Sequence, residues 1–255
     1  MIEYLFMNKI THPEISNIIV LPTKDSAIKA SARKIIEAVQ KNPQISITYA
    51  TGNTMIPVYA ELAKAVKAKE VDFSNTKAFH LDEYYPCSPD EEFSFVRFLN
   101  EKVFIPLNIP ESNINLLAGT AQDGVAEARR YDALVSKGID LAILGIGPGE
   151  HIGFNERNTP FDSRTHISQL SNETINRDQV ERGQDTPDKA LTQGIGTILE
   201  AKSILMIAYG ENKGGYLKNA LYGEITSNSP ASALRLVGDK VCIVIDQPAA
   251  DVLSV

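Results

Sequence analysis

The sequence has little of what a disulfide-stabilised or metal-binding protein needs. Its 255 residues include two cysteines and four histidines. Cys87 and Cys242 lie far apart and belong to no CxxC or CxxH pattern, so the sequence indicates neither a disulfide framework nor a zinc site. Because no Cys or His residues cluster, we expect no metal centre. Unpaired cysteines are typical of a reducing compartment, and we expect a cytoplasmic protein.

Positive charge and long apolar runs are also scarce. Lys and Arg number 25 against 32 Asp and Glu, which gives a formal net charge of -7. This balance argues against a general nucleic-acid or membrane-binding surface, but it allows a local basic site for an anionic metabolite. No apolar run approaches the length of a membrane span, and the N-terminal stretch has neither a basic segment nor a small-residue cleavage site. We therefore expect no membrane partner, no nucleic-acid partner and no export signal.

The chain does contain a regular alternation of two hydrophobic periods. Short runs rich in Ile and Val, most of them bounded by turn residues, predict buried strands. These runs lie at residues 17–21, 45–50, 77–81, 140–147, 203–210 and 241–245. Apolar stripes with a helical period predict helices between them. The helical stretches lie near residues 28–39, 59–66, 120–137 and 213–223.

This alternation predicts the architecture. Unbroken apolar strands separated by helices indicate an α/β fold with a doubly wound, mostly parallel sheet and helices on both faces. With 43% hydrophobic residues, the chain can bury a full core, and we expect a single domain over residues 1–255. One segment, at about 157–189, is polar and has little periodicity. It is either a lid over a site or a long surface excursion.

The loops after the strands are the places to search for a site, because ligands of open parallel sheets bind outside the carboxyl ends of the strands. Several predicted strands are followed by polar or glycine-containing clusters. They are "ATGNT" (50–54), "HLDEYY" (80–85), "GIGPGEHIGFNE" (145–156) and "YGENKG" (209–214). Since the strands are parallel, we expect all these clusters at the same end of the sheet.

The first cluster contains Thr51, Gly52, Asn53 and Thr54 and leads into a predicted helix. A glycine turn at a helix N-terminus presents unpaired N–H groups in the positive field of the helix dipole, which suits a phosphate. Lys213, in the last cluster, would supply a countercharge. The alternative is an ordinary N-cap made by Thr51 or Asn53, with a solvent-exposed lysine. It is no Walker loop, because GK[ST] does not follow.

The second cluster places Asp82 and Glu83 directly after an apolar strand. One carboxylate can face the crevice while its neighbour points away. A partly desolvated carboxylate at a strand end can act as a general base. The alternative is a turn or capping role, and the expected position at the site favours the base.

The third cluster, "GIGPGEHIGFNE", does not match familiar binding motifs. Glu150 stands where the third glycine of GxGxxG belongs, and Pro148 sits in the turn, so the cluster is no dinucleotide fingerprint. HExxH is absent, and His151 and Glu156 are too far apart in sequence to share one helical face. What remains is an imidazole and a carboxylate on a flexible loop, a pairing used for proton transfer near neutral pH. A lone histidine is often structural, but the expected neighbourhood of Asp82 favours a functional one.

Taken in order, "ATGNT", "LDEYY", "HIGFNE" and "LTQGIGTILEAKSILMIAYGENK" resemble the glucosamine-6-phosphate deaminase/isomerase family. The segments "HISQL" and "PASAL" are comparably similar to the related galactosamine-6-phosphate isomerases. The resemblance covers nearly the whole chain. It implies a Rossmann-like fold, a phosphorylated amino-sugar substrate, and chemistry that needs no metal or organic cofactor.

The resemblance also implies roles for individual residues. Asp82 matches the general base that moves a proton from C2 to C1 of the opened sugar. His151 matches the acid/base that opens the ring, and Glu156 matches its supporting carboxylate. The positions that match the phosphate site are Thr51, Gly52, Asn53, Thr54, Gly147 and Lys213. An arginine of the lid usually joins them, for which Arg177 is the candidate and Arg182 the next.

Some positions depart from the family pattern. The acid that usually stands two residues before the histidine is Gly149 here, and Glu150 stands where glycine is expected. Such a carboxylate orients the imidazole, and Glu150 is the candidate to replace it. Arg157 stands where a proline commonly follows the Asn–Glu pair. His166 stands where the regulated deaminases carry an arginine, so we expect no allosteric site of their kind.

Other functions stay open. A 6-phosphogluconolactonase resembles this family at the glycine–histidine loop, but Asn155 and Glu156 replace the small and hydroxylated residues that follow its histidine. A sugar-phosphate sensor would need a DNA-binding module, for which the chain leaves no room, although Gly149 keeps a binding-only role open. The gluco and galacto sugars differ only at the C4 hydroxyl, and no residue distinguishes them. A homo-oligomer is also open, because family members range from monomers to hexamers.

Overall fold

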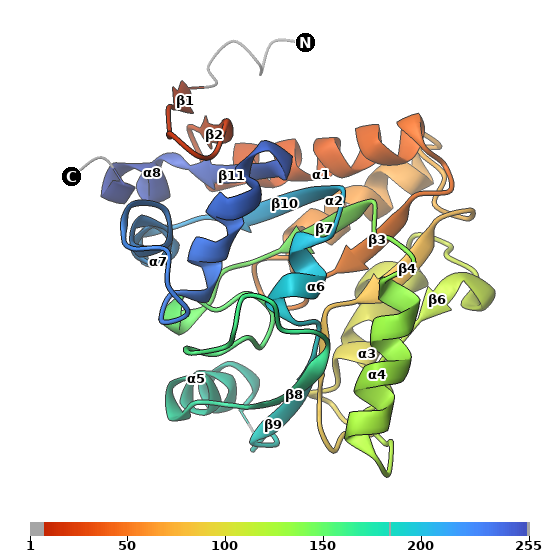
Figure 1. Ribbon diagram of the computed structural model, residues 1–255. Helices are drawn as coiled ribbons and strands as arrows, with labels where there is room; N and C mark the ends of the chain where they lie inside the picture. Colours follow the sequence, from red (N-terminus) through yellow and green to blue (C-terminus); the bar gives the residue numbers. More distant parts are fainter. Residues whose placement is uncertain (1–7, 184, 254–255) are drawn as a thin grey trace.

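The computed structural model describes residues 8–183 and 185–253. An eight-stranded sheet runs through it (Figure 1). In spatial order its strands are β1 (Asn8–Ile10), β2 (Asn17–Leu21), β11 (Val241–Asp246), β10 (Ser203–Ala208), β7 (Leu141–Leu144), β3 (Ser46–Tyr49), β4 (Lys77–His80) and β6 (Ile114–Asn115). Neighbours are parallel except β1, which is antiparallel to β2. The predicted doubly wound, mostly parallel sheet is confirmed.

Burial on both faces explains why the strands are unbroken apolar runs. Every residue of β3 and β7 is buried, and in β10 only the first residue is exposed. All the strands predicted from the apolar runs are present. The run predicted at 140–147 ends as a strand at Leu144, because the glycine-rich stretch after it leaves the sheet as a loop.

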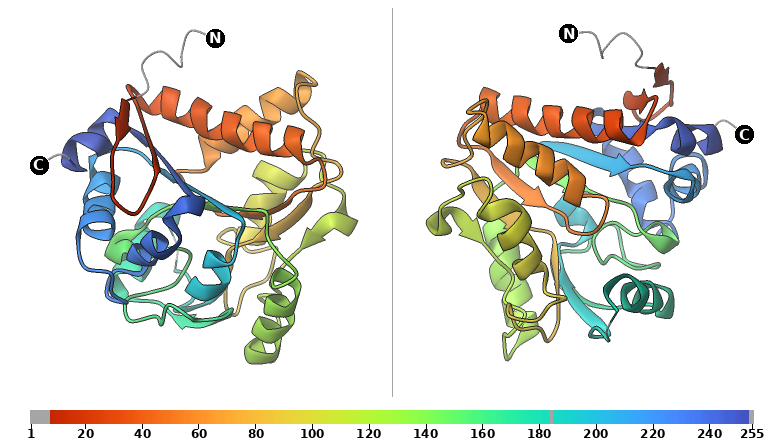
Figure 2. Two further views of the ribbon diagram at one scale, coloured as in Figure 1. Left: turned by 45° about the horizontal axis from the view of Figure 1, so that its top comes forward. Right: turned by 180° about the vertical axis from the view of Figure 1, so that it is seen from behind.

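Helices cover both faces of this sheet (Figure 1, Figure 2). On one face lie α1 (Lys24–Lys41) and α2 (Ile56–Lys67), and on the other lie α4 (Gly124–Val135), α6 (Ile195–Leu199) and α7 (Glu211–Tyr222). Right-handed crossovers explain this division, because the chain crosses the sheet one way from β2 to β4 and the other way from β6 to β11. The other helical segments are α3 (Phe95–Leu99), α5 (Asn172–Arg182), α8 (Gln247–Leu253), a π-helix (Asn100–Phe104) and 3-10 helices (Glu111–Asn113, Pro148–Glu150, Pro230–Lys240).

Helix α1 is formed by an apolar stripe with a helical period and by an N-terminal cap. Its predicted inward stripe is buried throughout: Ile28, Ala32, Ile35, Ile36 and Val39. The helix begins at a capping box, in which the Thr23 hydroxyl accepts from the Ser26 amide and the Ser26 hydroxyl accepts from the Thr23 amide. Such a cap is worth about 1 kcal/mol. Across residues 8–183 and 185–253, no helix has both the length and the apolar character needed to span a bilayer.

The strand order reverses between β3 and β7. After β3 the chain adds β4 and β6 on one side, and after β7 it adds β10 and β11 on the other. The loops that leave the two central strands therefore diverge and open a crevice at their carboxyl ends. These two loops carry the predicted clusters at 50–54 and 145–156.

A small antiparallel sheet lies beside the main one. It consists of β5 (Asp82–Tyr84), β9 (Lys189–Thr192) and β8 (His166–Gln169), with α5 nearby (Figure 1). The segment at 157–189 is thus no irregular excursion, since it contains a strand and a helix. Periodicity did not reveal α5 because, among its residues 172–181, whose burial the structure describes, those buried are the polar Thr174 and Asp178. Its ends carry recognisable signals, an N-cap at Ser171 and Gly183 in the left-handed conformation at φ 70°.

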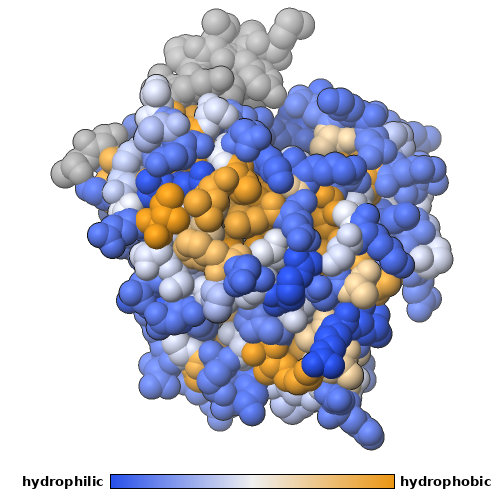
Figure 3. Space-filling view, viewed as in Figure 1, coloured by the Kyte–Doolittle hydropathy of each residue, from blue (hydrophilic) through white to orange (hydrophobic). Residues whose placement is uncertain are grey.

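Polar and charged side chains cover most of the face shown in Figure 3, and apolar ones gather near its upper centre. The most exposed large apolar side chain among the described residues, Val180 at 85%, lies on α5. Helix α5 therefore presents one side to solvent and turns Thr174 and Asp178 inward.

Candidate active site

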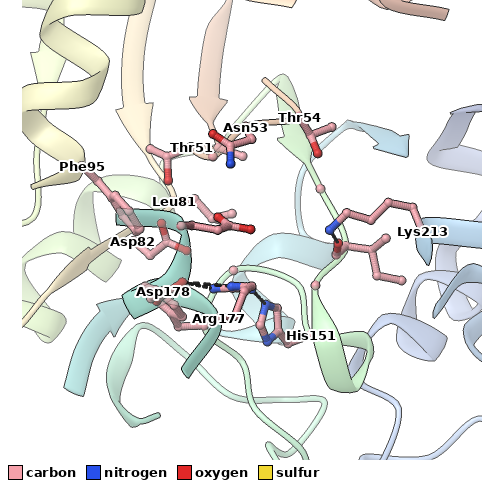
Figure 4. Close-up of a pocket in the computed structure, with 18 residues that line it drawn as sticks. Thr51, Asn53, Thr54, Leu81, Asp82, Phe95, His151, Arg177, Asp178 and Lys213 are labelled. Atoms are coloured by element: carbon pink, nitrogen blue, oxygen red, sulfur yellow. Dashed lines mark hydrogen bonds and ion pairs between the residues drawn. The ribbon is translucent and has the colours of Figure 1, made fainter. Parts of the chain in front are cut away.

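A pocket opens at the carboxyl ends of β3, β4, β7 and β10, where the strand order reverses (Figure 4). Residues of every predicted cluster line it, and α5 closes another side. The structure brings together the predicted residues Thr51, Gly52, Asn53, Thr54, Asp82, Gly147, His151, Arg177 and Lys213. Residues not predicted from the sequence also line it, among them Phe95, Phe154, Asp178 and Glu181.

The loop after β3 forms one end of the pocket. Helix α2 begins after Met55 with no side-chain cap, so the alternative in which Thr51 or Asn53 caps the helix is wrong. Gly52 has φ 100°, a conformation that favours glycine, and its carbonyl accepts from the Met55 amide. The loop therefore places residues 51–54 at the pocket, directly before the N-terminus of α2 (Figure 4).

Lys213 approaches the same end from the first turn of α7. Its ammonium donates to the carbonyl of Ile146 at 2.5 Å, and the side chain is partly buried, so the alternative of a solvent-exposed lysine is wrong. Burial and the positive charge of Arg177 lower the pKa of Lys213 to about 8, although Glu181 acts in the opposite sense. Lys213 is therefore a cation near neutral pH and loses its charge as the pH rises through about 8.

Asp82 and Glu83 point in opposite directions at the start of β5. Asp82 is 6% exposed and lines the pocket. Glu83 instead faces α3, where its carboxylate accepts from the Ser94 hydroxyl and from the Phe95 and Val96 amides at 2.9–3.0 Å. Strand alternation separates the two roles, and Glu83 holds the N-terminus of α3.

Buried groups that are neutral at physiological pH lie behind Asp82. Tyr59 and Tyr131 are fully buried, and burial raises the pKa of each phenol well above its ordinary value, with the charge of Asp82 adding to the effect. His80 is also fully buried, and desolvation lowers the pKa of its imidazole to about 3. The wall behind Asp82 therefore holds neutral phenols and a neutral imidazole at physiological pH.

The loop after β7 presents His151 to the pocket. Asn155, which is fully buried, donates to the carbonyls of Ile152 and Gln193 at 2.8 Å and so ties the loop to the end of β9. Gly147 lies against the imidazole so closely that a Cβ there would come within 1.9 Å of Nε2 of His151. Glycine at 147 is therefore needed to leave room for the ring.

The two ring nitrogens of His151 have different neighbours. Nη1 of Arg177 lies 3.2 Å from Nε2, and because a guanidinium can only donate, Nε2 must accept. The ring proton of the neutral imidazole is then on Nδ1, which lies 4.0 Å from Oε2 of Glu156. Burial, together with the charges of Arg177 and Lys213, lowers the pKa of His151 to about 3. His151 is accordingly a neutral base in this arrangement.

Glu150 does not take the place of the missing acid. The residue adopts φ 59°, and its carboxylate accepts from the Asn219 amide on α7 at 3.0 Å, outside the pocket. A Cβ on Gly149 would come within 3.1 Å of Nε of Arg157, so the position where the family carries its acid lies against that arginine. Glu156 is therefore the carboxylate that faces His151.

Helix α5 holds Arg177 at the pocket (Figure 4). Nε and Nη2 of Arg177 donate to Oδ1 of Asp178 at 2.9 and 2.6 Å, and Asp178 also accepts from the Tyr84 hydroxyl at 2.5 Å. Burial tends to lower the pKa of Arg177, but Asp178 outweighs it and the pKa lies above its usual value. The side chain of Arg182, the other arginine considered, lies outside the part of the chain that the structure describes.

The pocket combines a buried carboxylate, a neutral imidazole and two cations, which are groups that can transfer protons and bind an anion. Within the described ranges, no group of three or more His, Cys, Asp or Glu side chains is arranged to hold a metal ion.

Sequence comparisons place these residues among known relatives. The family model of glucosamine-6-phosphate isomerases/6-phosphogluconolactonase matches residues 23–243. The glucosamine-6-phosphate deaminase of Lachnoclostridium phytofermentans is 40% identical over 230 residues, which cover 88% of this chain and 98% of that protein. The glucosamine-6-phosphate deaminase of Thermoanaerobacter sp. (strain X514) is 36% identical over 240 residues, which cover 92% and 94%.

Solved structures show the same likeness. A monomeric glucosamine-6-phosphate deaminase superimposes with a TM-score of 0.89 at 33% identity, covering 92% of this chain and 99% of that one. The 6-phosphogluconolactonase of Thermotoga maritima superimposes with a TM-score of 0.70 at 20% identity, covering 90% and 98%. At that lower identity the likeness concerns the fold alone.

Proposed function

Because this chain belongs to the glucosamine-6-phosphate deaminase/isomerase family, we propose that it converts an amino-sugar 6-phosphate and water into a ketohexose 6-phosphate and ammonia. Glucosamine 6-phosphate is the proposed substrate, since relatives at 36% and 40% identity are glucosamine-6-phosphate deaminases. Galactosamine 6-phosphate, its C4 epimer, is the alternative. The observation that carries the proposal is that Asp82 and His151 face one pocket with an anion site at its end.

The phosphate occupies the end formed by the loop after β3. Backbone N–H groups and hydroxyls of Thr51 and Thr54 donate to it, and the N-terminus of α2 adds its dipole. Lys213 and Arg177 supply two positive charges from opposite sides of the pocket. This anchoring places the sugar ring toward Asp82 and His151.

His151 opens the sugar ring. Its neutral Nε2 takes the proton of the anomeric hydroxyl and returns it to the ring oxygen as the bond between C1 and that oxygen breaks. The product is the open-chain aldehyde. Glu156 faces Nδ1 and stabilises the imidazolium that forms between the two transfers.

Asp82 carries out the isomerisation. It removes the proton from C2, the electrons of that bond form a double bond between C1 and C2, and the aldehyde oxygen becomes a hydroxyl by taking a proton from the ammonium group of the substrate. Asp82 then returns its proton to C1, which converts this enolamine into the protonated imine of a ketose. Water adds to the imine carbon and the nitrogen leaves as ammonium, so the atoms and the positive charge of the substrate balance. Asp82 is suited to this role because it lines the pocket and is only 6% exposed, beside the neutral phenols of Tyr59 and Tyr131.

A parallel assay of three sugars tests the proposal. The purified protein is given glucosamine 6-phosphate, galactosamine 6-phosphate and 6-phosphogluconolactone, and ammonia, ketose phosphate and lactone hydrolysis are measured. Ammonia and ketose phosphate in equal amounts from an amino sugar support the proposal and identify the epimer. Hydrolysis of the lactone without ammonia from either amino sugar would overturn it.

A further inference from the structure

Helix α5 reaches both ring nitrogens of His151. On the pocket side, Arg177 of α5 lies at Nε2. On the other side, Glu156 faces Nδ1, and the same helix holds Glu156 through its first turn. Helix α5 therefore contacts the imidazole directly through Arg177 and is connected to its other side through Glu156.

Thr174 is the residue that makes the second connection. It is fully buried, and its hydroxyl donates to Oε1 of Glu156 at 2.6 Å. The Ser171 hydroxyl donates to Oγ1 of Thr174 at 3.1 Å, which leaves the single hydroxyl hydrogen of Thr174 for the carboxylate. The Ser171 amide adds a longer contact of 3.3 Å to the same carboxylate oxygen.

These contacts set the direction of the Glu156 carboxylate. With Oε1 occupied by donors from α5, Oε2 is the oxygen that faces the ring. No acid at position 149 shares this task, because the residue there is Gly149 and Glu150 is bonded to α7. Arg177 contacts Nε2 directly, whereas Nδ1 has no hydrogen-bond partner among the residues that the structure describes and faces Glu156 across 4.0 Å. The Glu156 carboxylate therefore acts on the ring through its charge, and the Thr174 hydroxyl sets where that charge lies.

We propose that Thr174 is a positioning residue for ring opening, which acts through Glu156 on His151 and couples the histidine to α5. This inference rests on the proposed function, in which His151 opens the sugar ring. Partners that orient metal-bound histidines typically change affinity or activity by about 10- to 100-fold, and we expect an effect of the same order here.

Thr174→Val tests the inference, because it removes the hydroxyl and keeps the shape, and Thr174→Ser is the matched control that restores it. We expect kcat of Thr174→Val to fall by roughly 10- to 100-fold while KM changes by less than about 3-fold, and Thr174→Ser to stay close to the wild type. Binding of the reduced open-chain amino-sugar phosphate, which needs no ring opening, should be equal in all three proteins. Thermal unfolding of each variant identifies a loss that is merely structural.

A second readout follows the imidazole without turnover. The ¹⁵N resonances of His151, assigned by comparison with His151→Gln, should agree between the wild type and Thr174→Ser. In Thr174→Val the Nδ1 resonance should shift, because the carboxylate that faces Nδ1 loses its anchor, while Arg177 keeps Nε2 as the acceptor. Unchanged kcat and unchanged resonances in Thr174→Val would overturn the inference and leave the proposed function intact. Equal losses in both Thr174 variants would also overturn it. Absence of ammonia release from the wild type would overturn the proposed function and this inference with it.

Discussion

Nη1 of Arg177 lies 3.2 Å from Nε2 of His151, so an arginine that lines the pocket together with Lys213 and residues 51–54 contacts the predicted ring-opening base. In the proposed reaction, Nε2 must be released before it can take the proton of the anomeric hydroxyl. A substrate phosphate attracts the guanidinium, and Asp178 keeps the other edge of Arg177 in place meanwhile. Binding of the phosphate and activation of the base are thereby linked.

Inorganic phosphate should raise the pKa of His151. Burial is the main cause of the low value of about 3, but the charges of Arg177 and Lys213 add to it, and phosphate would neutralise them. NMR titration of the His151 ring with and without phosphate measures the shift. Arg177→Gln should raise the pKa as well, whereas Arg164→Gln, an arginine paired with Asp132 and Glu200, should not. A pKa that falls or stays constant on adding phosphate would contradict this linkage.

Substrate affinity should decline as pH rises through about 8. The pKa of Lys213 is lowered to about 8, so its ammonium is charged below that pH and neutral above it. Losing a hydrogen bond from a charged group costs about 1.5–3 kcal/mol, which corresponds to a KM roughly 10- to 100-fold higher. Lys213→Met should show the high KM at all pH values, and Lys218→Met, farther along α7 and outside the pocket, should follow the wild type. A wild-type KM that is flat from pH 7 to 9 would count against this role of Lys213.

Gly147→Ala should be far more damaging than Gly145→Ala, although the two glycines belong to the same loop. A methyl group at 147 would come within 1.9 Å of Nε2 of His151, whereas one at 145 would meet only the flexible end of Met55 at 3.4 Å. Displacing the imidazole by about 1 Å costs on the order of 100-fold in kcat/KM. Steady-state kinetics of the two variants measures the difference. Similar kinetics would mean that His151 can move without loss.

The folded protein should lose stability as pH falls from about 6.5 toward 3. His80 and His151 both have pKa values of about 3, below the ordinary value of 6.5. Between these two pH values both imidazoles are therefore protonated in the unfolded chain and neutral in the folded chain. Each histidine lowers the free energy of unfolding by up to about 1.4 kcal/mol for every pH unit below 6.5, and its contribution to stability is fully present above pH 6.5. Urea unfolding at pH 7 and pH 5 measures the slope. His80→Gln should lower that slope, and an unchanged slope would show that His80 is not kept neutral by folding.

The main sheet and its loops could be predicted because one physical pattern encodes them. Buried parallel strands need continuous apolar runs, and parallel strands bring their following loops to one edge. Asp82, His151 and Lys213 were therefore expected at one pocket from their positions after strands alone. The strands of the small sheet escaped because their sequences, DEY, HISQ and KALT, mix polar and apolar residues and form no continuous apolar run.

Other features depend on contacts that no local pattern contains. Asp178 and Thr174 are polar residues buried by partners far away in the sequence, Tyr84 and Glu156. Glu150 is adjacent to His151 in sequence, yet its left-handed backbone turns the carboxylate to α7. Signals for α5 itself were present, since Ser171 and Gly183 mark its ends as typical caps do.

The central claim is that Asp82 transfers the C2 proton in a pocket that binds the sugar phosphate independently of it. Asp82→Asn keeps the shape of the side chain and removes the base, and ammonia release from glucosamine 6-phosphate by this variant and by the wild type is the most direct test. We predict that the variant loses at least about 100-fold in kcat and still binds the reduced open-chain amino-sugar phosphate as tightly as the wild type. Ammonia release at the wild-type rate by Asp82→Asn would contradict the account.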